Sequence, residues 1–204
     1  MGRLHLPDND ELNPAQRAVY DEVVSGPRGR LIGPLRAVIH CPDLATRWSR
    51  LGEYLRYSTC LPPKLNELAI LVTGRHWNSQ LEFFVHAKAA AAAGLSTHVI
   101  ESLRTATQPV FDDQAEVDIY EYARLLLATG TVTDEVHASI VKRWGEQGAV
   151  ELTGLIGYYT MVAFTLNAHE IPLPDEGEPP LTMTGRAPTI LPPASETAGA
   201  KIGE

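Results

Sequence analysis

The chain is poor in cysteine and in aromatic residues. It has two cysteines among 204 residues, Cys41 and Cys60, and aromatic residues make up 7% of it. The cysteines are too far apart for a CxxC motif or a zinc-binding pattern, and so few are not typical of a secreted disulfide scaffold. A disulfide stays open, but we expect free, buried thiols. The scarcity of aromatic residues predicts a core of Leu, Ile, Val and Ala.

Runs of basic and of apolar residues are also missing. Lys and Arg number 17 against 25 Asp and Glu, a formal net charge of −8. An acidic chain without a basic patch is repelled by phosphate backbones, so we expect no nucleic-acid partner. The N-terminus has no apolar export segment, and no stretch approaches the roughly 20 apolar residues of a membrane span. We therefore expect no membrane association and a cytoplasmic protein.

The length and the hydrophobic periodicity predict a single all-α domain. Asn13-Pro14 and Pro42-Asp43 are typical helix starts, and Gly94 and Gly130 are typical stops. No alternating strand pattern is present. We expect a bundle of seven or eight helices, over residues 14–25, 42–57, 63–74, 77–93, 97–107, 113–129, 134–146 and 148–168.

The bundle is predicted to lie between two less regular segments. Residues 1–13 are expected to form an N-terminal arm, 14–170 the helical domain, and 171–204 a proline-rich tail. The tail cannot form a core of its own, so we expect it to be disordered or to lie on a neighbouring subunit. The helix over 77–93 is apolar or small nearly all round, which predicts that it is buried among other helices.

One segment carries the candidate chemistry. Ser79, Glu82 and His86 fall within an arc of about 60° on one helix face, at about 100° per residue. Buried polar groups need partners, so three on one face indicate a polar network or a pocket. Glu67, on the preceding helix, is placed to reach His86 and fix its tautomer. A carboxylate–imidazole pair is a common general acid/base near neutral pH.

Each of these residues also has a structural interpretation. His86 is interpretable as a core histidine, Glu67 as a residue that serves the helix dipole, and Glu82 as the partner of Arg75 or Lys88. Ser79 is interpretable as a helix-start residue, Arg75 as a solvated charge, and Trp77 and Tyr159 as core aromatics. A metal site of His76, Glu82 and His86 is conceivable, but their spacing matches no strong metal motif, and we expect none.

The spacing of Glu67, Ser79, Glu82 and His86, followed by alanine-rich sequence and Gly94-Leu95, resembles the carboxymuconolactone decarboxylase family. This family belongs to the superfamily of the alkylhydroperoxidase D (AhpD)-type proteins. The resemblance covers about residues 40–175 and includes the segment from Leu68 to Val72 and the helix from Gly157 to Asn167. It implies the AhpD-like helical fold and assembly as a homo-oligomer, a trimer or a hexamer.

The chain departs from the peroxidase branch of the superfamily. That branch has a CxxC motif where this sequence has Ser79 and Glu82, and neither Cys41 nor Cys60 stands at those positions. The departure removes the thiolate nucleophile that peroxidase chemistry needs. The glutamate with a histidine four residues later, Glu82 and His86, resembles the decarboxylase branch, which needs neither a metal nor an organic cofactor.

The resemblance implies a role for each candidate residue. His86 would be the acid/base, oriented by Glu67, and Glu82 and Ser79 would relay a proton or hydrogen-bond the substrate. Arg75 would anchor an anionic substrate, and Trp77 and Tyr159 would wall the pocket. The leading hypothesis is a carboxy-lyase for a small carboxylated, cyclic or aromatic-derived substrate. The alternatives are a non-catalytic, ligand-binding helical oligomer and a hydroperoxide reductase weakened by the missing CxxC motif.

Overall fold

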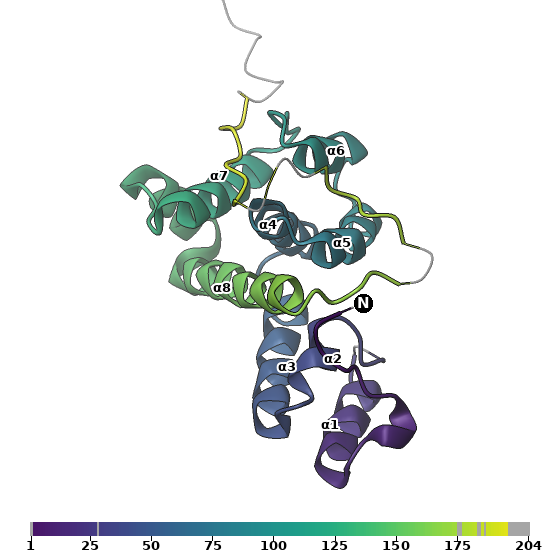
Figure 1. Cartoon of the computed structure of the whole chain (residues 1–204). Helices are drawn as coiled ribbons and strands as arrows, with labels where there is room; N and C mark the ends of the chain where they lie inside the picture. Colours follow the sequence, from purple (N-terminus) through teal and green to yellow (C-terminus); the bar gives the residue numbers. More distant parts are fainter. Residues whose placement is uncertain (1, 28, 175–176, 183–184, 186, 196–204) are drawn as a thin grey trace, which may run out of the picture.

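A computed structural model describes residues 2–27, 29–174, 177–182, 185 and 187–195. These residues form a helical bundle without strands, as the sequence predicts (Figure 1). A short 3-10 helix spans Asn9–Glu11. The α-helices are α1 (Pro14–Ser25), α2 (Pro34–Val38), α3 (Pro42–Tyr57), α4 (Pro63–His76), α5 (Gln80–Ala92), α6 (Thr97–Thr105), α7 (Gln114–Thr129) and α8 (Asp134–Ala168).

The N-terminal helices begin where local chemistry favours a start. The Asn13 side chain accepts a hydrogen bond from the Gln16 backbone N–H, and Pro14 occupies the first helical position of α1. Helix α2 lies between the helices predicted over 14–25 and 42–57, where the sequence predicts none. It begins after Gly33, whose φ of 59° favours glycine. A single turn of helix after such a residue leaves no periodic signal in the sequence.

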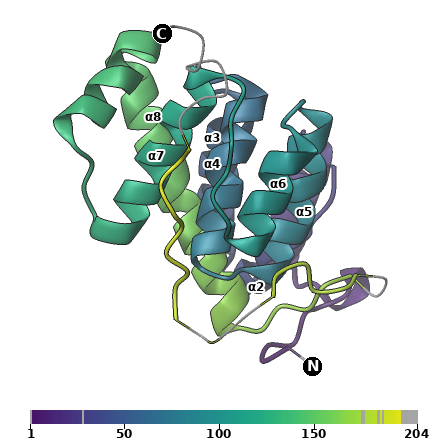
Figure 2. The same ribbon diagram turned by 90° about the horizontal axis from the view of Figure 1, so that it is seen from above.

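Helix α4 lies at the centre of the bundle. It contacts α3, α5, α6, α7 and α8, and every residue from Leu65 to His76 is buried (Figure 2). The sequence assigns the most buried position to the helix over 77–93, and this is wrong. In the structure, α5 buries one face only, because its far side is partly or fully exposed. The helix break falls at Asn78, which has a φ of 54°, rather than at Gly74.

The last long helix joins two predicted helices. The two helices predicted over 134–146 and 148–168 together make up α8 and meet at a kink at Gly145, whose backbone is non-helical with a φ of 70° and a ψ of −178°. By length and hydropathy α8 could cross a membrane, but 56% of its most apolar window is buried within the protein. Such burial is typical of the core helix of a globular protein.

The described part of the C-terminal tail packs on the helices of its own chain, and the expected contact with a neighbouring subunit stays a prediction. Residues 196–204 of the tail lie outside the described part of the chain. The segment crosses the bundle near α6 and α7 in Figure 1. Leu181 and Leu191 are buried, and the Leu181 backbone exchanges two hydrogen bonds of 2.9 Å with the Gln80 side chain. Tyr120 donates a further hydrogen bond of 2.6 Å to the Pro192 carbonyl. Apolar side chains between prolines can therefore order a segment that has no periodicity.

Candidate functional site

A buried carboxylate–imidazole pair joins α4 to α5. The Nδ1 of His86 lies 2.6 Å from Oε2 of Glu67, and both side chains are less than 10% exposed. Because Nδ1 is bonded to the carboxylate, Nε2 is the ring nitrogen that we expect to exchange a proton with a ligand. The structure thus brings together two of the predicted catalytic residues in a geometry suited to acid–base chemistry.

Arg56, on α3, is a third member of this cluster that sequence reasoning misses. Its Nε and Nη2 each lie 3.3 Å from Oε1 of Glu67. Burial alone raises the pKa of Glu67, but the hydrogen bond from His86 and the charges of His86 and Arg56 outweigh it and hold the pKa below its ordinary value. Burial opposes the charge of Arg56, yet the neighbouring Tyr159 and Glu67 raise the pKa of its guanidinium. Glu67 is therefore a carboxylate at neutral pH.

Glu82 lies one helical turn before His86 and is buried without a partner. Neither carboxyl oxygen has a hydrogen-bond partner in the described part of the chain. Its side chain lies against the backbone of Gly74, where an added Cβ would stand 3.1 Å from Oε1. Burial raises the pKa of Glu82 well above its ordinary value. Burial thus favours the neutral form of this carboxyl, which is able to donate a hydrogen bond.

Ser79 is buried at the N-cap position of α5. Its side chain makes no capping hydrogen bond, and its Oγ has no partner among the described residues. A buried hydroxyl without a partner is unusual, because each such group costs free energy. Glu82 and Ser79, three residues apart, therefore both lack hydrogen-bond partners within the described part of the chain.

The acid–base residues line a small pocket between α2, α3, α5 and α8. Its volume is about 60 Å³, and its polar walls include Arg56, Glu82 and His86. The Tyr159 ring also lines it and packs edge-on against the His86 ring at 5.0 Å between centroids. Aliphatic side chains and the segment from Ile32 to Pro34 complete the wall. A cavity of this size has room for a few water molecules or a very small ligand.

Arg75 and Trp77 lie outside this pocket, which corrects their expected place in it. Arg75 hydrogen-bonds to Asn78 and, at 3.1 Å, to Oγ1 of Thr189 in the tail. Trp77 donates through Nε1 to Oγ1 of Thr160 at 3.1 Å. Trp77 instead lines a neighbouring cavity of about 530 Å³, which shares two leucines with the acid–base pocket, Leu81 and Leu166.

The thiols are exposed, so the expectation of buried cysteines is wrong. Cys41 and Cys60 are free and exposed, and neither lines the acid–base pocket. Partial burial of the Cys60 sulfur and the neighbouring Glu151 carboxylate raise the pKa of this thiol, which disfavours the thiolate. Within the described residues, His, Cys, Asp and Glu side chains nowhere gather in a group of three that could hold a metal.

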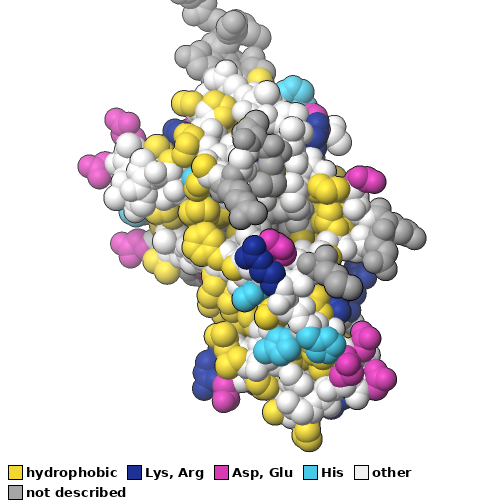
Figure 3. All heavy atoms as spheres, viewed as in Figure 1, with side chains coloured by type: hydrophobic (Ala, Val, Ile, Leu, Met, Phe, Trp, Pro, Cys, Tyr) yellow, Lys and Arg dark blue, Asp and Glu magenta, His cyan; other side chains and the backbone are white. Residues whose placement is uncertain are grey.

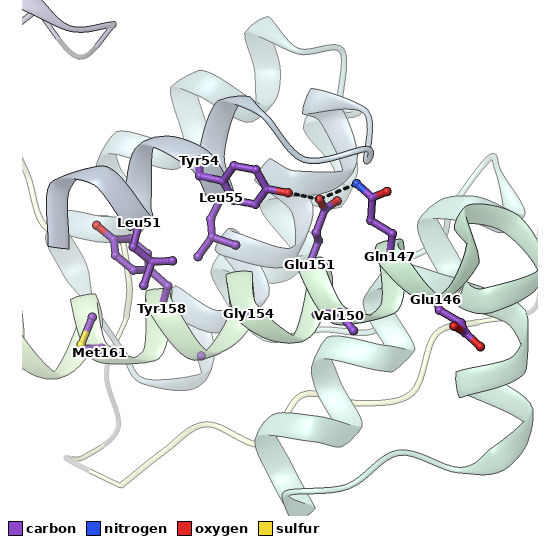
Figure 4. Close-up of a pocket in the computed structure, with 11 residues that line it drawn as sticks. Leu51, Tyr54, Leu55, Glu146, Gln147, Val150, Glu151, Gly154, Tyr158 and Met161 are labelled. Carbon is purple, nitrogen blue, oxygen red and sulfur yellow. Dashed lines mark hydrogen bonds between the residues drawn. The ribbon is translucent and has the colours of Figure 1, made fainter. Parts of the chain in front are cut away.

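A separate, open groove lies between α3 and α8 (Figure 4). It has a volume of about 710 Å³ and apolar walls that include Leu51, Val150 and Met161. At one end the Glu151 carboxylate accepts hydrogen bonds from Tyr54 at 2.5 Å and from Gln147 at 2.9 Å. Figure 3 shows hydrophobic side chains gathered on the face over α8. The groove differs chemically from the acid–base pocket, because its Glu151 carboxylate has hydrogen-bond partners, whereas the carboxyl of Glu82 has none among the described residues.

Comparison with known proteins shows the fold. No protein-family profile matches the chain, and no curated protein matches it by sequence. An uncharacterized peroxidase-related protein from Ralstonia eutropha, with an alkylhydroperoxidase AhpD core, matches with a TM-score of 0.69 and 12% identity over 86% of this chain and 93% of that chain. An uncharacterized peroxidase-related protein from Silicibacter sp. matches with a TM-score of 0.68 and 14% identity, over the same shares.

A third similar structure is that of a debrominase. The debrominase Bmp8, solved as a variant in complex with 2,3,4-tribromopyrrole, matches with a TM-score of 0.60 and 12% identity over 85% of this chain and 91% of that chain. Peroxidase-related proteins and a debrominase thus share one architecture, so the architecture alone does not select an activity. The chain has the fold of the AhpD-like proteins.

Proposed function

We propose that this protein is a cofactor-free acid–base enzyme, a carboxy-lyase similar to carboxymuconolactone decarboxylase, that acts on a small carboxylated, cyclic or aromatic-derived substrate. The observation that carries the proposal is the 2.6 Å contact between His86 and Glu67 in a pocket that also holds the buried Glu82. A histidine that is hydrogen-bonded to a carboxylate and lies beside a neutral carboxyl is suited to general acid–base catalysis.

The proposed reaction needs a proton donor, a hydrogen-bond donor for the enolate and a wall that excludes water. The bond between the substrate carbon and its carboxylate breaks, CO₂ leaves, and the electron pair moves into an adjacent carbonyl to give an enolate. Protonated His86 then delivers a proton to carbon, and Glu67 stabilises the imidazolium while it is charged. The neutral Glu82 donates a hydrogen bond to the enolate oxygen, where negative charge develops. The aliphatic wall excludes water and so strengthens these interactions.

The positions of the thiols favour this reaction over hydroperoxide reduction. A thiol peroxidase needs a thiolate in the site, and the residues at the family's cysteine positions are Ser79 and Glu82. Cys41 and Cys60 lie outside the acid–base pocket. We therefore assign the chemistry to the imidazole and the carboxyl groups.

The pocket volume limits the substrate. About 60 Å³ is far below the 300–1,000 Å³ typical of pockets for drug-sized ligands. A lactone the size of γ-carboxymuconolactone would require the wall to move, and the segment from Ile32 to Pro34 is the part of the wall outside the central helices. We propose that this segment opens for substrate entry.

Measurement of CO₂ release tests the proposed function. Purified protein is incubated with γ-carboxymuconolactone and with a panel of smaller carboxylated lactones and keto acids. We expect turnover by the wild type and a loss of about a hundredfold or more in His86→Ala. His137→Ala, which changes an exposed histidine on α8, is the matched control and should retain activity. Binding without turnover in this panel would instead favour the non-catalytic helical oligomer.

We propose further that the protein is a homo-oligomer, a trimer or a hexamer. The apolar groove between α3 and α8 supports this, because two of the side chains that line it, Leu51 and Val150, are 48% and 72% exposed. Light scattering at micromolar concentration should give the mass of an oligomer, and Val150→Glu should lower it. A monomeric wild type would contradict the proposal.

We also propose a cytoplasmic location, on the basis of the acidic composition and the two free cysteines. Cell fractionation with an antibody to the protein should recover it with the cytoplasmic fraction. Recovery in the membrane or the extracellular fraction would contradict this.

A further inference from the structure

Arg56 supplies a fixed positive charge to the acid–base pocket. It comes from α3, outside the two helices that carry the candidate motif, and its side chain is 18% exposed. A guanidinium stays protonated in proteins, so this charge is present at every relevant pH. Burying a cation at a pocket wall costs free energy, which an interaction with an anion can offset.

The donors of Arg56 are only partly used. A guanidinium has five N–H groups. In the described part of the chain, Nε donates a hydrogen bond of 3.3 Å to Oε1 of Glu67, and Nη2 forms an ion pair with the same oxygen at 3.3 Å. These are long contacts for a charge-assisted pair. The N–H groups of Nη1, and the N–H of Nη2 that points away from Glu67, therefore remain able to donate to a ligand oxygen.

The rest of the pocket does not oppose an anion. The nearest carboxylate, Glu67, is already bound by His86. Glu82 is buried, and both of its carboxyl oxygens lack partners among the described residues. With Glu82 neutral, an anion entering the pocket meets the guanidinium of Arg56 and the hydrogen-bond donors of Glu82 and His86, whereas a cation meets the repulsion of Arg56. The volume of about 60 Å³ admits the head of a carboxylate and little else.

We propose that Arg56 binds an anionic oxygen pair of the substrate and so determines that this pocket selects anions. The inference rests on the proposed function for the identity of the substrate, but not for the binding itself. A cation on a departing carboxylate would stabilise the ground state more than the transition state, in which the charge has moved away. The group at Arg56 is therefore an anchor, and it is not the group that leaves. Arg75, which the sequence favours for this role, is engaged by Asn78 and Thr189 instead.

Acetate and acetamide are the probes that test this assignment. They have nearly the same size and shape and differ in charge. The ring-proton NMR signals of His86 report binding, and ionic strength is held constant. We expect acetate to shift these signals in the wild type and acetamide to bind at least tenfold more weakly. Arg56→Gln should reduce the acetate affinity about tenfold or more and remove the preference over acetamide.

Two further variants separate ligand binding from structural support of Glu67. Arg50→Gln removes an arginine from the outer side of α3, where it pairs with Glu22, and should leave the acetate affinity unchanged. Arg56→Lys keeps the positive charge but loses the paired N–H donors of the guanidinium, and it should give an intermediate acetate affinity. A purely structural role for Arg56 would alter the His86 signals of the free protein but would not change the ratio of acetate to acetamide affinity.

The outcomes distinguish this inference from the proposed function. Equal affinity of the wild type for acetate and acetamide, or an unchanged ratio in Arg56→Gln, would overturn the assignment of Arg56 even if CO₂ release is observed. A wild-type preference for acetate that Arg56→Gln removes supports the assignment even if no carboxylated compound is turned over.

Discussion

The unsatisfied carboxyl of Glu82 makes the stability of the protein depend on pH in a way that one substitution removes. Its pKa is raised by burial in the folded protein, from an ordinary value of 4.5. Below pH 4.5 the carboxyl is protonated in both the folded and the unfolded chain. Above it, the unfolded chain releases the proton and the folded chain keeps it. Stability is therefore lost as the pH rises from 4.5 towards the folded pKa.

The size of the effect follows from linkage. Each pH unit in this window lowers the free energy of unfolding by about 1.4 kcal/mol. For a protein of about this size, that corresponds to a decrease in Tm of roughly 3–6 °C per pH unit. Glu82→Gln has nearly the same shape and no ionisable proton, so its stability should lack this slope. The difference between the two proteins isolates Glu82, because the other titrating groups are common to both.

Thermal and urea unfolding between pH 4 and pH 7, followed by circular dichroism, measures the slope. We expect the stability of Glu82→Gln relative to the wild type to increase steadily with pH above 4.5. Glu146→Gln, which changes an exposed glutamate on α8, is the control and should stay parallel to the wild type. If the curves of wild type and Glu82→Gln are parallel over this range, then Glu82 is ionised in the folded protein and cannot act as a neutral donor.

Three further predictions concern the same pocket. Glu67→Gln should lower kcat by about 10²–10⁴, because His86 loses its carboxylate partner. Glu67 also contributes free energy of unfolding above its ordinary pKa, and this contribution is lost as the pH falls through the lowered pKa of the folded protein. Acid unfolding of Glu67→Gln should lack this contribution. Unchanged kinetics and an unchanged dependence of stability on acidic pH would contradict this. Gly74→Ala should lower activity more than it lowers Tm, since its Cβ would stand 3.1 Å from Oε1 of Glu82; full activity in a folded variant would show that the carboxyl position does not matter. Ile32→Ala should extend turnover to larger substrates, measured as a rise in kcat/KM with substrate length, and an unchanged ratio would show that this wall does not limit access.

The sequence predicts the helices well where their ends have a chemical signal. Asn13-Pro14 and Pro42 mark the starts of α1 and α3 at the residues where the structure has them. The contact between Glu67 and His86 is also predictable, since helical spacing fixes which face each residue occupies. Helix α2 has no such signal, because it is a short helix that follows Gly33, which has a φ of 59°. The predicted division of residues 134–168 into two helices agrees with the kink at Gly145.

The rest of the site depends on tertiary packing. Arg56 is one of several charged residues on α3, and only the packing of α3 against α4 brings it to Glu67. Arg75 is near the motif in sequence, but it lies in the last turn of α4 and is bound by the tail. Sequence proximity and charge therefore favour Arg75, whereas the fold places Arg56 in the pocket. The tail is similar, because its buried leucines are ordered by a surface that only the folded bundle provides.

The central claim is that an imidazole and carboxyl groups perform the chemistry and that thiols do not. Turnover by the wild type, by His86→Gln and by the double variant Cys41→Ser, Cys60→Ser tests it most directly. We predict that the double variant keeps the wild-type rate of CO₂ release and that His86→Gln loses about a hundredfold or more. Full activity in His86→Gln, or a loss of activity in the double cysteine variant with His86 intact, would contradict the account.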